Sequence, residues 1–187
     1  MSFVFFLMLL GFSMPSYAGS QRSSDALLQT LQLHQKKIPI RSKFKQVKLM
    51  KGLDIEIHSE GELEVKDATH AVWKILKPSY FSVEISPQDV RIYSSPSAPP
   101  RIIKKAASES SQMEGGAWIH FLMEKPELVV EHFDVSLVSP QSFRLKPLKS
   151  DQGFDFIELS FADHASLSKV YIQENKEDSL SISFTGK

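Results

Sequence analysis

Residues 61–78 read GELEVKDATHAVWKILKP, and this stretch indicates the fold. Apolar side chains alternate with polar ones on both sides of a central turn, at Leu63, Val65, Ala71, Trp73 and Ile75. Alternation with a period of two is typical of a β-strand that buries one face and leaves the other in water. The stretch contains no nucleophile motif, metal-ligand cluster or phosphate-binding loop. It therefore predicts a hairpin of an antiparallel sheet with one apolar face.

The same alternation continues on both sides of this hairpin. Further strands are expected around these apolar residues: Phe44; Leu53, Ile55 and Ile57; Phe81, Val83 and Ile85; Val90 and Ile92; Val135 and Leu137; Phe143 and Leu145; and the ranges 154–161, 167–172 and 180–184. We expect short antiparallel strands joined by polar turns. Residues 94–116 break the pattern with Ser, Pro, Glu and Gly, and they predict a long loop that contains one brief strand.

Two segments have helical spacing instead. A serine at position 23 or 24 can cap a helix that begins near Asp25 and stops before Pro39, which cannot continue it. The second segment covers residues 118–133 and predicts one helix, or two short helices broken at Pro126.

The number of strands predicts the overall architecture. A sheet of about ten strands cannot stay flat, because each pair of strands adds roughly 20–25° of twist. It curls, and its concave face must be filled or covered. The predicted fold class is α+β: a curled antiparallel sheet that forms an incomplete, unclosed β-barrel covered by helices. Barrels near this size hold either packed side chains or one small ligand, and the pattern alone leaves both open.

Composition excludes several classes of function. The chain carries 22 basic and 22 acidic residues, so its net charge of zero gives no electrostatic reason to bind nucleic acid. Because it has no cysteine, disulfides and thiolate chemistry are excluded. The six histidines form no metal-ligand pattern, no Gly-x-Ser-x-Gly elbow is present, and no glycine loop suits a nucleotide. We therefore expect no catalytic residues, no metal, no cofactor and no enzymatic activity.

The N-terminus predicts export. Phe3–Phe12 is an apolar run too short to span a bilayer, which takes about 20 residues. Ser16 and Ala18 supply the small residues of a cleavage site after Ala18, although no Lys or Arg precedes the run. We expect residues 1–18 to be a signal peptide and residues 19–187 to form a single domain. A retained membrane anchor is the alternative.

The order of landmarks along the chain resembles the periplasmic lipoprotein carrier family (LolA-type). The landmarks are Phe44-x-Gln46, Gly61-x-Leu63, Trp73, Lys77-Pro78, a strand ending at Tyr93, and Phe143-x-Leu145-x-Pro147. Val72 stands where the family's carrier has the arginine that helps to latch its lid, and the proline expected at Asp67-Ala68 is missing. The carrier also has a C-terminal segment beyond the strand that here ends near Lys187. The resemblance is therefore to a divergent member.

The resemblance implies an unclosed barrel with a helical lid that acts as a carrier. Such a protein would shield the acyl chains of a lipoprotein or another acylated lipid in an apolar cavity during transfer between envelope membranes. Its partners would be that cargo and transfer proteins of the inner and outer membranes, and it would be a periplasmic monomer. The alternative is a lipid-sensing or protein-interaction module of the envelope that docks through residues 94–116.

Apolar residues of the predicted concave face are the candidate ligand contacts. They are Leu63, Val65, Trp73, Ile75, Phe81, Val83 and Ile92 on the strands, and Trp118, Phe121 and Leu122 on the helix that would form the lid. A place in an ordinary packed core is the competing interpretation for each of them, because apolar area serves both purposes.

Overall fold

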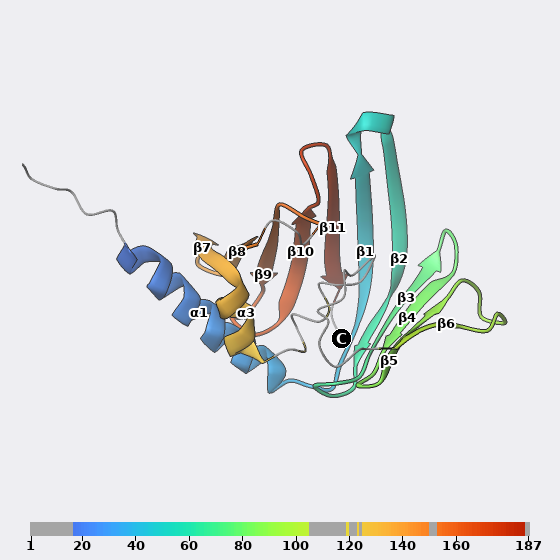
Figure 1. The fold of residues 1–187 in the computed structure, drawn as a ribbon, viewed down its shortest axis with the longest axis horizontal. Coiled ribbons are helices and arrows are strands. Elements are labelled where there is room, and N and C mark those ends of the chain that lie inside the picture. Colours follow the sequence, from blue (N-terminus) through green and yellow to red (C-terminus); the bar gives the residue numbers. More distant parts are fainter. Residues whose placement is uncertain (1–16, 105–118, 120–122, 124, 150–152, 186–187) are drawn as a thin grey trace, which may run out of the picture.

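The alternating segments form one antiparallel sheet of eleven strands (Figure 1). The computed structural model describes residues 17–104, 119, 123, 125–149 and 153–185. The strands are β1 (Ile40–Met50), β2 (Ile55–Val65), β3 (Ala71–Lys77), β4 (Phe81–Ile85), β5 (Asp89–Tyr93), β6 (Arg101–Lys104), β7 (Phe133–Ser139), β8 (Ser142–Pro147), β9 (Phe156–Phe161), β10 (Leu167–Gln173) and β11 (Asp178–Thr185). The helical elements are α1 (Tyr17–Gln35), α3 (Pro126–His132) and a short 3-10 turn, η1 (Lys51–Leu53).

The order of the strands in the sheet shows where the barrel stays open. The order is β6-β5-β4-β3-β2-β1-β11-β10-β9-β8-β7, so strands consecutive in the chain are neighbours in the sheet except for β6 and β7, and β1 pairs with β11. A pairing between β6 and β7 would close this meander into a barrel, but these two strands are its edges. The predicted fold class, an unclosed antiparallel barrel with helices, is confirmed.

The first helix begins earlier than predicted. The sequence predicts a start near Asp25, but α1 begins at Tyr17, and positions 23 and 24 lie inside it rather than at its N-cap. Once a helix has nucleated, each added residue gains a hydrogen bond, and residues 17–24 contain no proline to stop this. The predicted end is confirmed, because α1 stops at Gln35, ahead of Pro39.

The second helical segment is broken at Pro126, as one of the two predicted alternatives requires. Pro126 is the first residue of α3, a position where its missing N–H costs no hydrogen bond. Ile119 and Met123, which precede it, are helical and buried. Phe133, predicted in the helix, is instead the first residue of β7. The brief strand expected within residues 94–116 is confirmed as β6.

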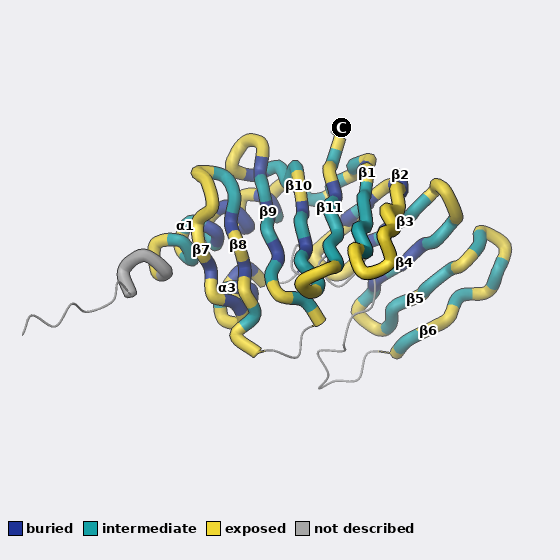
Figure 2. Tube along the Cα trace, turned by 90° about the horizontal axis from the view of Figure 1, so that it is seen from above, coloured by how far each residue is buried: buried dark blue, intermediate teal, exposed yellow. Residues whose placement is uncertain are grey.

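The helices lie against one end of the concave face. α1 contacts α3 and β7, and α3 also contacts β7. Figure 2 shows both helices behind β7 and β8. Leu27 and Leu31 of α1 and Val129 of α3 are buried and belong to the same core as the apolar face of the strands. Within the described ranges, no helix is both long and apolar enough to cross a membrane.

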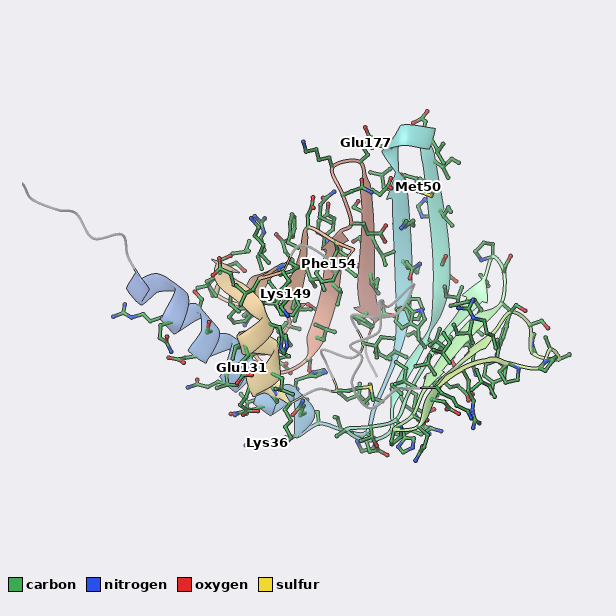
Figure 3. The ribbon with its side chains drawn as sticks, viewed as in Figure 1. Lys36, Met50, Glu131, Lys149, Phe154 and Glu177 are labelled. Carbon is green, nitrogen blue, oxygen red and sulfur yellow. The ribbon has the colours of Figure 1, made fainter. Side chains whose placement is uncertain are left out.

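Two turns project together at the far end of the sheet. Met50 marks the turn between β1 and β2, Glu177 marks the turn between β10 and β11, and Lys36 at the end of α1 lies at the opposite end of the molecule (Figure 3). The backbone N–H of Lys51 donates to the carbonyl of Glu177 at 3.1 Å, which joins the two turns. The two turns therefore support each other at this end of the sheet.

Candidate functional site

The strand registers place the predicted residues of the strands on one face. Leu63 of β2 lies opposite Trp73 of β3, which lies opposite Val83 of β4. Val83 in turn lies opposite Ile92 of β5. Because directly paired residues point to the same side of a sheet, these side chains form one row across four strands.

A second set of pairings adds the remaining strand residues to this face. Val65 pairs with Ala71, and Ile75 pairs with Phe81. Every predicted strand residue thus lies on the concave face, although not equally accessible. Leu63, Val65, Trp73 and Val83 are buried, whereas Ile75, Phe81 and Ile92 are half-buried. The predicted lid residues Trp118, Phe121 and Leu122 lie outside the described residues.

Trp73 is part of an aromatic stack that crosses the sheet. Its ring lies 3.5 Å from the ring of Phe44, centroid to centroid, with 10° between the ring planes. Phe44 is on β1 and Trp73 is on β3, so the ring of Phe44 must pass over β2, and it does so at Gly61, its register partner. A Cβ at Gly61 would lie 2.5 Å from Cζ of Phe44 and 2.0 Å from the carbonyl oxygen of Lys74. Only glycine leaves room for this stack.

The stack explains why three sequence landmarks occur together. Phe44, Gly61 and Trp73 are parts of one packing unit, and Phe184 of β11 completes it with its ring edge-on to Trp73 at 6.5 Å. Trp73 is only 2% exposed, so its contacts are mainly with protein.

The sequence predicts two separate short strands, one around Ile57 and one around Leu63. This prediction is wrong, because both residues belong to the single strand β2, which continues through Gly61.

A pocket of about 150 Å³ opens onto the concave face near the C-terminal end of α1. Its apolar wall consists of Ile40, Leu63, Val65, Leu167 and Phe184. Two of these are predicted site residues, whereas Ile40, Leu167 and Phe184 were not predicted. The alternation of apolar residues on β1, β10 and β11 is the sequence signal that points to them.

The rim of this pocket is polar, and its groups tie α1 to the sheet. Lys37 donates to Asp163 at 3.0 Å and to Ser166 at 2.7 Å. The hydrogen bond from Lys37, followed by those from the backbone N–H and the hydroxyl of Ser166, holds the pKa of Asp163 well below its usual range. The Nδ1 atom of His34 lies 2.7 Å from the carbonyl oxygen of Ala165, and burial of its ring lowers the pKa of His34.

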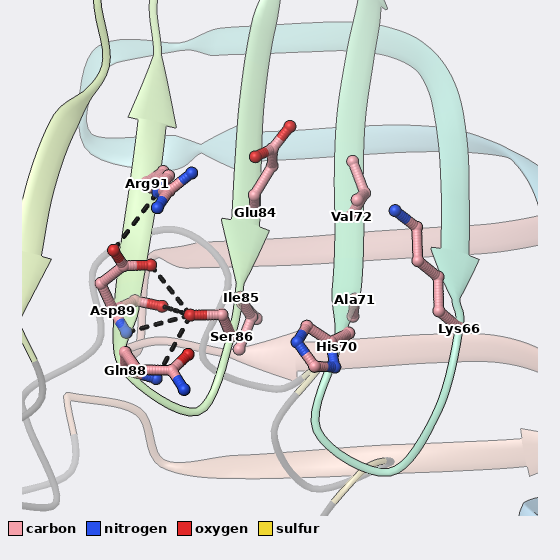
Figure 4. Close-up of a pocket in the computed structure, with 10 residues that line it drawn as sticks. All are labelled: Lys66, His70, Ala71, Val72, Glu84, Ile85, Ser86, Gln88, Asp89 and Arg91. Carbon is pink, nitrogen blue, oxygen red and sulfur yellow. Dashed lines mark hydrogen bonds and ion pairs between the residues drawn. The ribbon is translucent and has the colours of Figure 1, made fainter.

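A larger hollow of about 310 Å³ lies on the opposite, polar face (Figure 4). Val72, Glu84 and Arg91 form a row across β3, β4 and β5 there. Much of its charge is already paired: Arg91 contacts Asp89 at 3.3 Å. The hydroxyl of Tyr93 donates to Glu84 at 3.1 Å. We interpret this hollow as a polar surface groove that is separate from the apolar candidate site.

The described part of the chain contains no group of three or more histidine or carboxylate side chains placed to share a metal ion. Two of the described histidines bind local partners instead. His70 pairs with Asp67 at 2.9 Å, and His132 contacts the carbonyl oxygen of Leu128 at 2.6 Å. Hydrogen bonds from Thr69 and then His70 hold the pKa of Asp67 below its usual range. These contacts stabilise a turn and a helix end.

The fold and the site together define a class: an α+β protein with a curled, unclosed antiparallel sheet, an apolar concave face and helices against one end of it. No family model matches the sequence, and no curated protein matches it.

Solved structures are similar to this fold. An uncharacterized conserved protein from Thermus thermophilus matches with a TM-score of 0.50 and 11% identity, over 84% of this chain and 85% of that chain. A LolA superfamily protein from Nitrosomonas europaea matches with a TM-score of 0.45 and 6% identity, over 87% of this chain and 91% of that chain. A domain assigned to outer membrane lipoprotein sorting, from Vibrio parahaemolyticus, matches with a TM-score of 0.49 and 8% identity, over 89% and 91%. At 11% identity, the match to the Thermus thermophilus protein shows a similarity of fold alone.

Proposed function

We propose that this protein is a periplasmic carrier or chaperone that shields the acyl chains of a lipoprotein or another acylated lipid while they move between envelope membranes. The observation that supports this proposal is the continuous apolar face of an unclosed sheet, with a pocket opening onto it beside α1. The candidate contacts are the concave-face residues of β2–β5. Residues 1–18 would be removed as a signal peptide, and residues 19–187 would form the carrier domain.

The driving force for binding would be burial of methylene groups. Each buried methylene contributes about 0.8 kcal/mol, so a chain of about 14 methylenes contributes roughly 10 kcal/mol before entropy losses. The pocket of about 150 Å³ is smaller than the roughly 300–1,000 Å³ that ligand sites of small molecules usually occupy. Loading would therefore require a helix to move away from the concave face. The contacts of His34 and Lys37 with the β9–β10 turn would have to loosen or act as a hinge.

The first experiment is mass spectrometry of organic extracts from the mature protein, purified from the envelope fraction without detergent. We expect a stoichiometric acylated species. Substitution of Trp73 would be uninformative, because its stack with Phe44 makes it a folding residue. The half-buried Phe81 is the better position, so Phe81→Glu should reduce the bound lipid at least fivefold while circular dichroism shows a folded sheet.

The matched control is Ile102→Glu, which places the same charge at an exposed apolar position of the edge strand β6, opposite Arg91 on the polar face. It should leave the bound lipid unchanged. An empty extract, together with no binding of a fluorescent fatty acid by delipidated and refolded protein, would contradict the proposed function. Equal loss in both variants would also contradict it, because the effect would then not depend on the concave face.

A further inference from the structure

Among the described strands, none pairs with one edge of the projecting part of β2. β2 pairs with β1 along its whole length, from Val65 opposite Ile40 to Ile55 opposite Met50. On its other side, the ladder with β3 ends where Glu60 pairs with Lys77. Among the described residues, no strand pairs with residues 55–59 on that side. Figure 1 shows β1 and β2 continuing beyond β3–β6, which lean away from them. We call residues 55–59 the β2 edge.

Two local features make β3 separate from β2 at this point. The register shifts between Glu60 and Gly61, so that Leu76 of β3 is an extra residue without a partner in the ladder. Such a bulge bends its strand away and interrupts pairing. Pro78 follows directly, and it has no N–H with which to extend the ladder. The bulge at Leu76 and the proline at position 78 therefore account for the separation of β3 from β2.

The side chains of the β2 edge alternate as those of a paired strand do. Ile55 and Ile57 point to the concave side, in phase with Leu63 and Val65, yet they are 42% and 41% exposed. Glu56 lies on the other side, where it contacts Nε2 of His58 at 2.7 Å. Leu76, at the base of the separation, is 46% exposed. The edge therefore combines free backbone groups with apolar side chains in a continuation of the concave face.

We propose that the β2 edge binds an extended peptide segment as an added strand. An unpaired edge presents N–H and C=O groups at strand spacing, which another polypeptide backbone matches and a lipid does not. Natural edges are usually protected by lysine, proline or a covering element. Residues 55–59 contain neither lysine nor proline, and their carboxylate at Glu56, next to Asp54, favours a basic residue on the incoming strand. The partner is thus a segment that alternates apolar and basic residues.

This inference does not depend on the proposed carrier function, because the edge can be tested without lipid. It would also explain how one surface could hold a polypeptide while the adjacent concave face holds an apolar chain. Leu53, Ile55 and Ile57 are 64%, 42% and 41% exposed, so the described residues leave this edge accessible to a second chain.

The test uses the purified protein without substitutions and a capped, dye-labelled peptide of six residues in which valine and lysine alternate. We expect saturable binding by fluorescence anisotropy. A matched peptide with N-methyl groups on the amides of one edge cannot form a ladder, and it should bind at least tenfold more weakly. Hydrogen exchange should slow at alternate amides within residues 55–59 when the unmodified peptide binds.

Two protein variants locate the site. Ile57→Lys should weaken binding of the unmodified peptide at least tenfold, whereas Leu137→Lys, which adds the same charge on a different edge strand, should not. Both positions are solvent-accessible, so the fold is expected to survive, and circular dichroism checks this. Equal binding of the two peptides, equal effects of the two variants, or new protection elsewhere than residues 55–59 would overturn the proposal.

Two other occupants of the β2 edge are distinguishable in the same samples. Concentration-dependent dimerisation in sedimentation that Ile57→Lys abolishes, without peptide binding, would assign the edge to a second copy of the chain and overturn the proposal. Binding to vesicles of phosphatidylglycerol and phosphatidylethanolamine that Ile57→Lys abolishes, again without peptide binding, would assign it to a membrane surface and overturn it as well.

Discussion

Replacement of Gly61 by alanine tests the packing unit that connects β1, β2 and β3. The added Cβ would lie 2.0 Å from the carbonyl oxygen of Lys74 and 2.5 Å and 2.8 Å from Cζ and Cε1 of Phe44. The carbonyl belongs to the backbone of a paired strand, so it cannot move alone. The ring of Phe44 is held by Trp73 and cannot rotate away without losing the stack. Gly61→Ala must therefore strain β3 and also weaken the Phe44–Trp73 contact.

The magnitude follows from these two terms. Overpacking a filled core costs about 1–3 kcal/mol. Loss of an aromatic pair costs about 0.5–1.5 kcal/mol beyond the buried area. We expect Gly61→Ala to lower the free energy of unfolding by about 2–4 kcal/mol. For a domain of this size, about 3 kcal/mol corresponds to a fall in Tm of about 6–12 °C.

The assay is urea unfolding followed by tryptophan fluorescence and circular dichroism. Gly52→Ala is the matched control, because its added Cβ meets Oε2 of Glu177 at 2.8 Å, at the end of a flexible side chain that can move. This control should stay within about 0.5 kcal/mol of the parent protein. The double variant Gly61→Ala with Phe44→Leu should recover part of the loss, since it removes the ring contact but keeps the clash with Lys74.

A free energy of unfolding for Gly61→Ala within about 0.5 kcal/mol of the parent would refute this reasoning. It would mean that Phe44 and Trp73 do not pack across Gly61 in solution. Equal losses for Gly61→Ala and Gly52→Ala would refute it too, because the effect would then reflect glycine replacement in general.

Two further predictions concern the core and α1. Leu145 is 0% exposed, so Leu145→Ala should lower the free energy of unfolding, measured in urea, by about 2–5 kcal/mol. Leu148 is 63% exposed, so Leu148→Ala should lower it by less than about 0.5 kcal/mol. Similar losses for the two variants would contradict the assigned faces. Burial lowers the pKa of His34, so the unfolded chain binds its proton first and stability should fall as the pH drops below about 6.5. In His34→Gln, the urea midpoint of unfolding should change less with pH between about pH 5 and pH 7 than in the parent protein. If the two proteins show the same dependence on pH, His34 does not titrate in this range.

Much of the fold could be predicted because it rests on short-range pattern. A strand residue's face depends only on its position in the alternation, so Leu63, Trp73 and Val83 were assigned correctly to one face. Pro126 and Pro39 acted locally in the same way, since a missing N–H and a fixed φ limit helices wherever they occur. The N-terminal boundary of α1 was missed because serine is only a weak helix breaker and capping depends on context.

The candidate site could be predicted only in part. The members from β2–β5 were found because they share one hairpin region of the sequence. The wall formed by Ile40, Leu167 and Phe184 comes from strands far apart in the chain, and no local pattern shows that β1 lies between β2 and β11. Which residues are accessible could not be predicted either, because a half-buried Phe81 and a buried Trp73 have equivalent positions in the alternation.

The amino-acid pattern alone predicts a curled antiparallel sheet with one apolar face and two helical segments, and it contains no recognisable catalytic or metal-binding motif. Periodicity, proline positions and composition are properties of neighbouring residues, so they can be read without coordinates. Three features appear only in the folded protein: Gly61 makes room for a stack between Phe44 and Trp73, a pocket opens beside α1, and β2 extends beyond β3 with an edge that no described strand covers. These features arise from contacts between strands that are distant in sequence, where the size of one side chain is matched to the gap left by another.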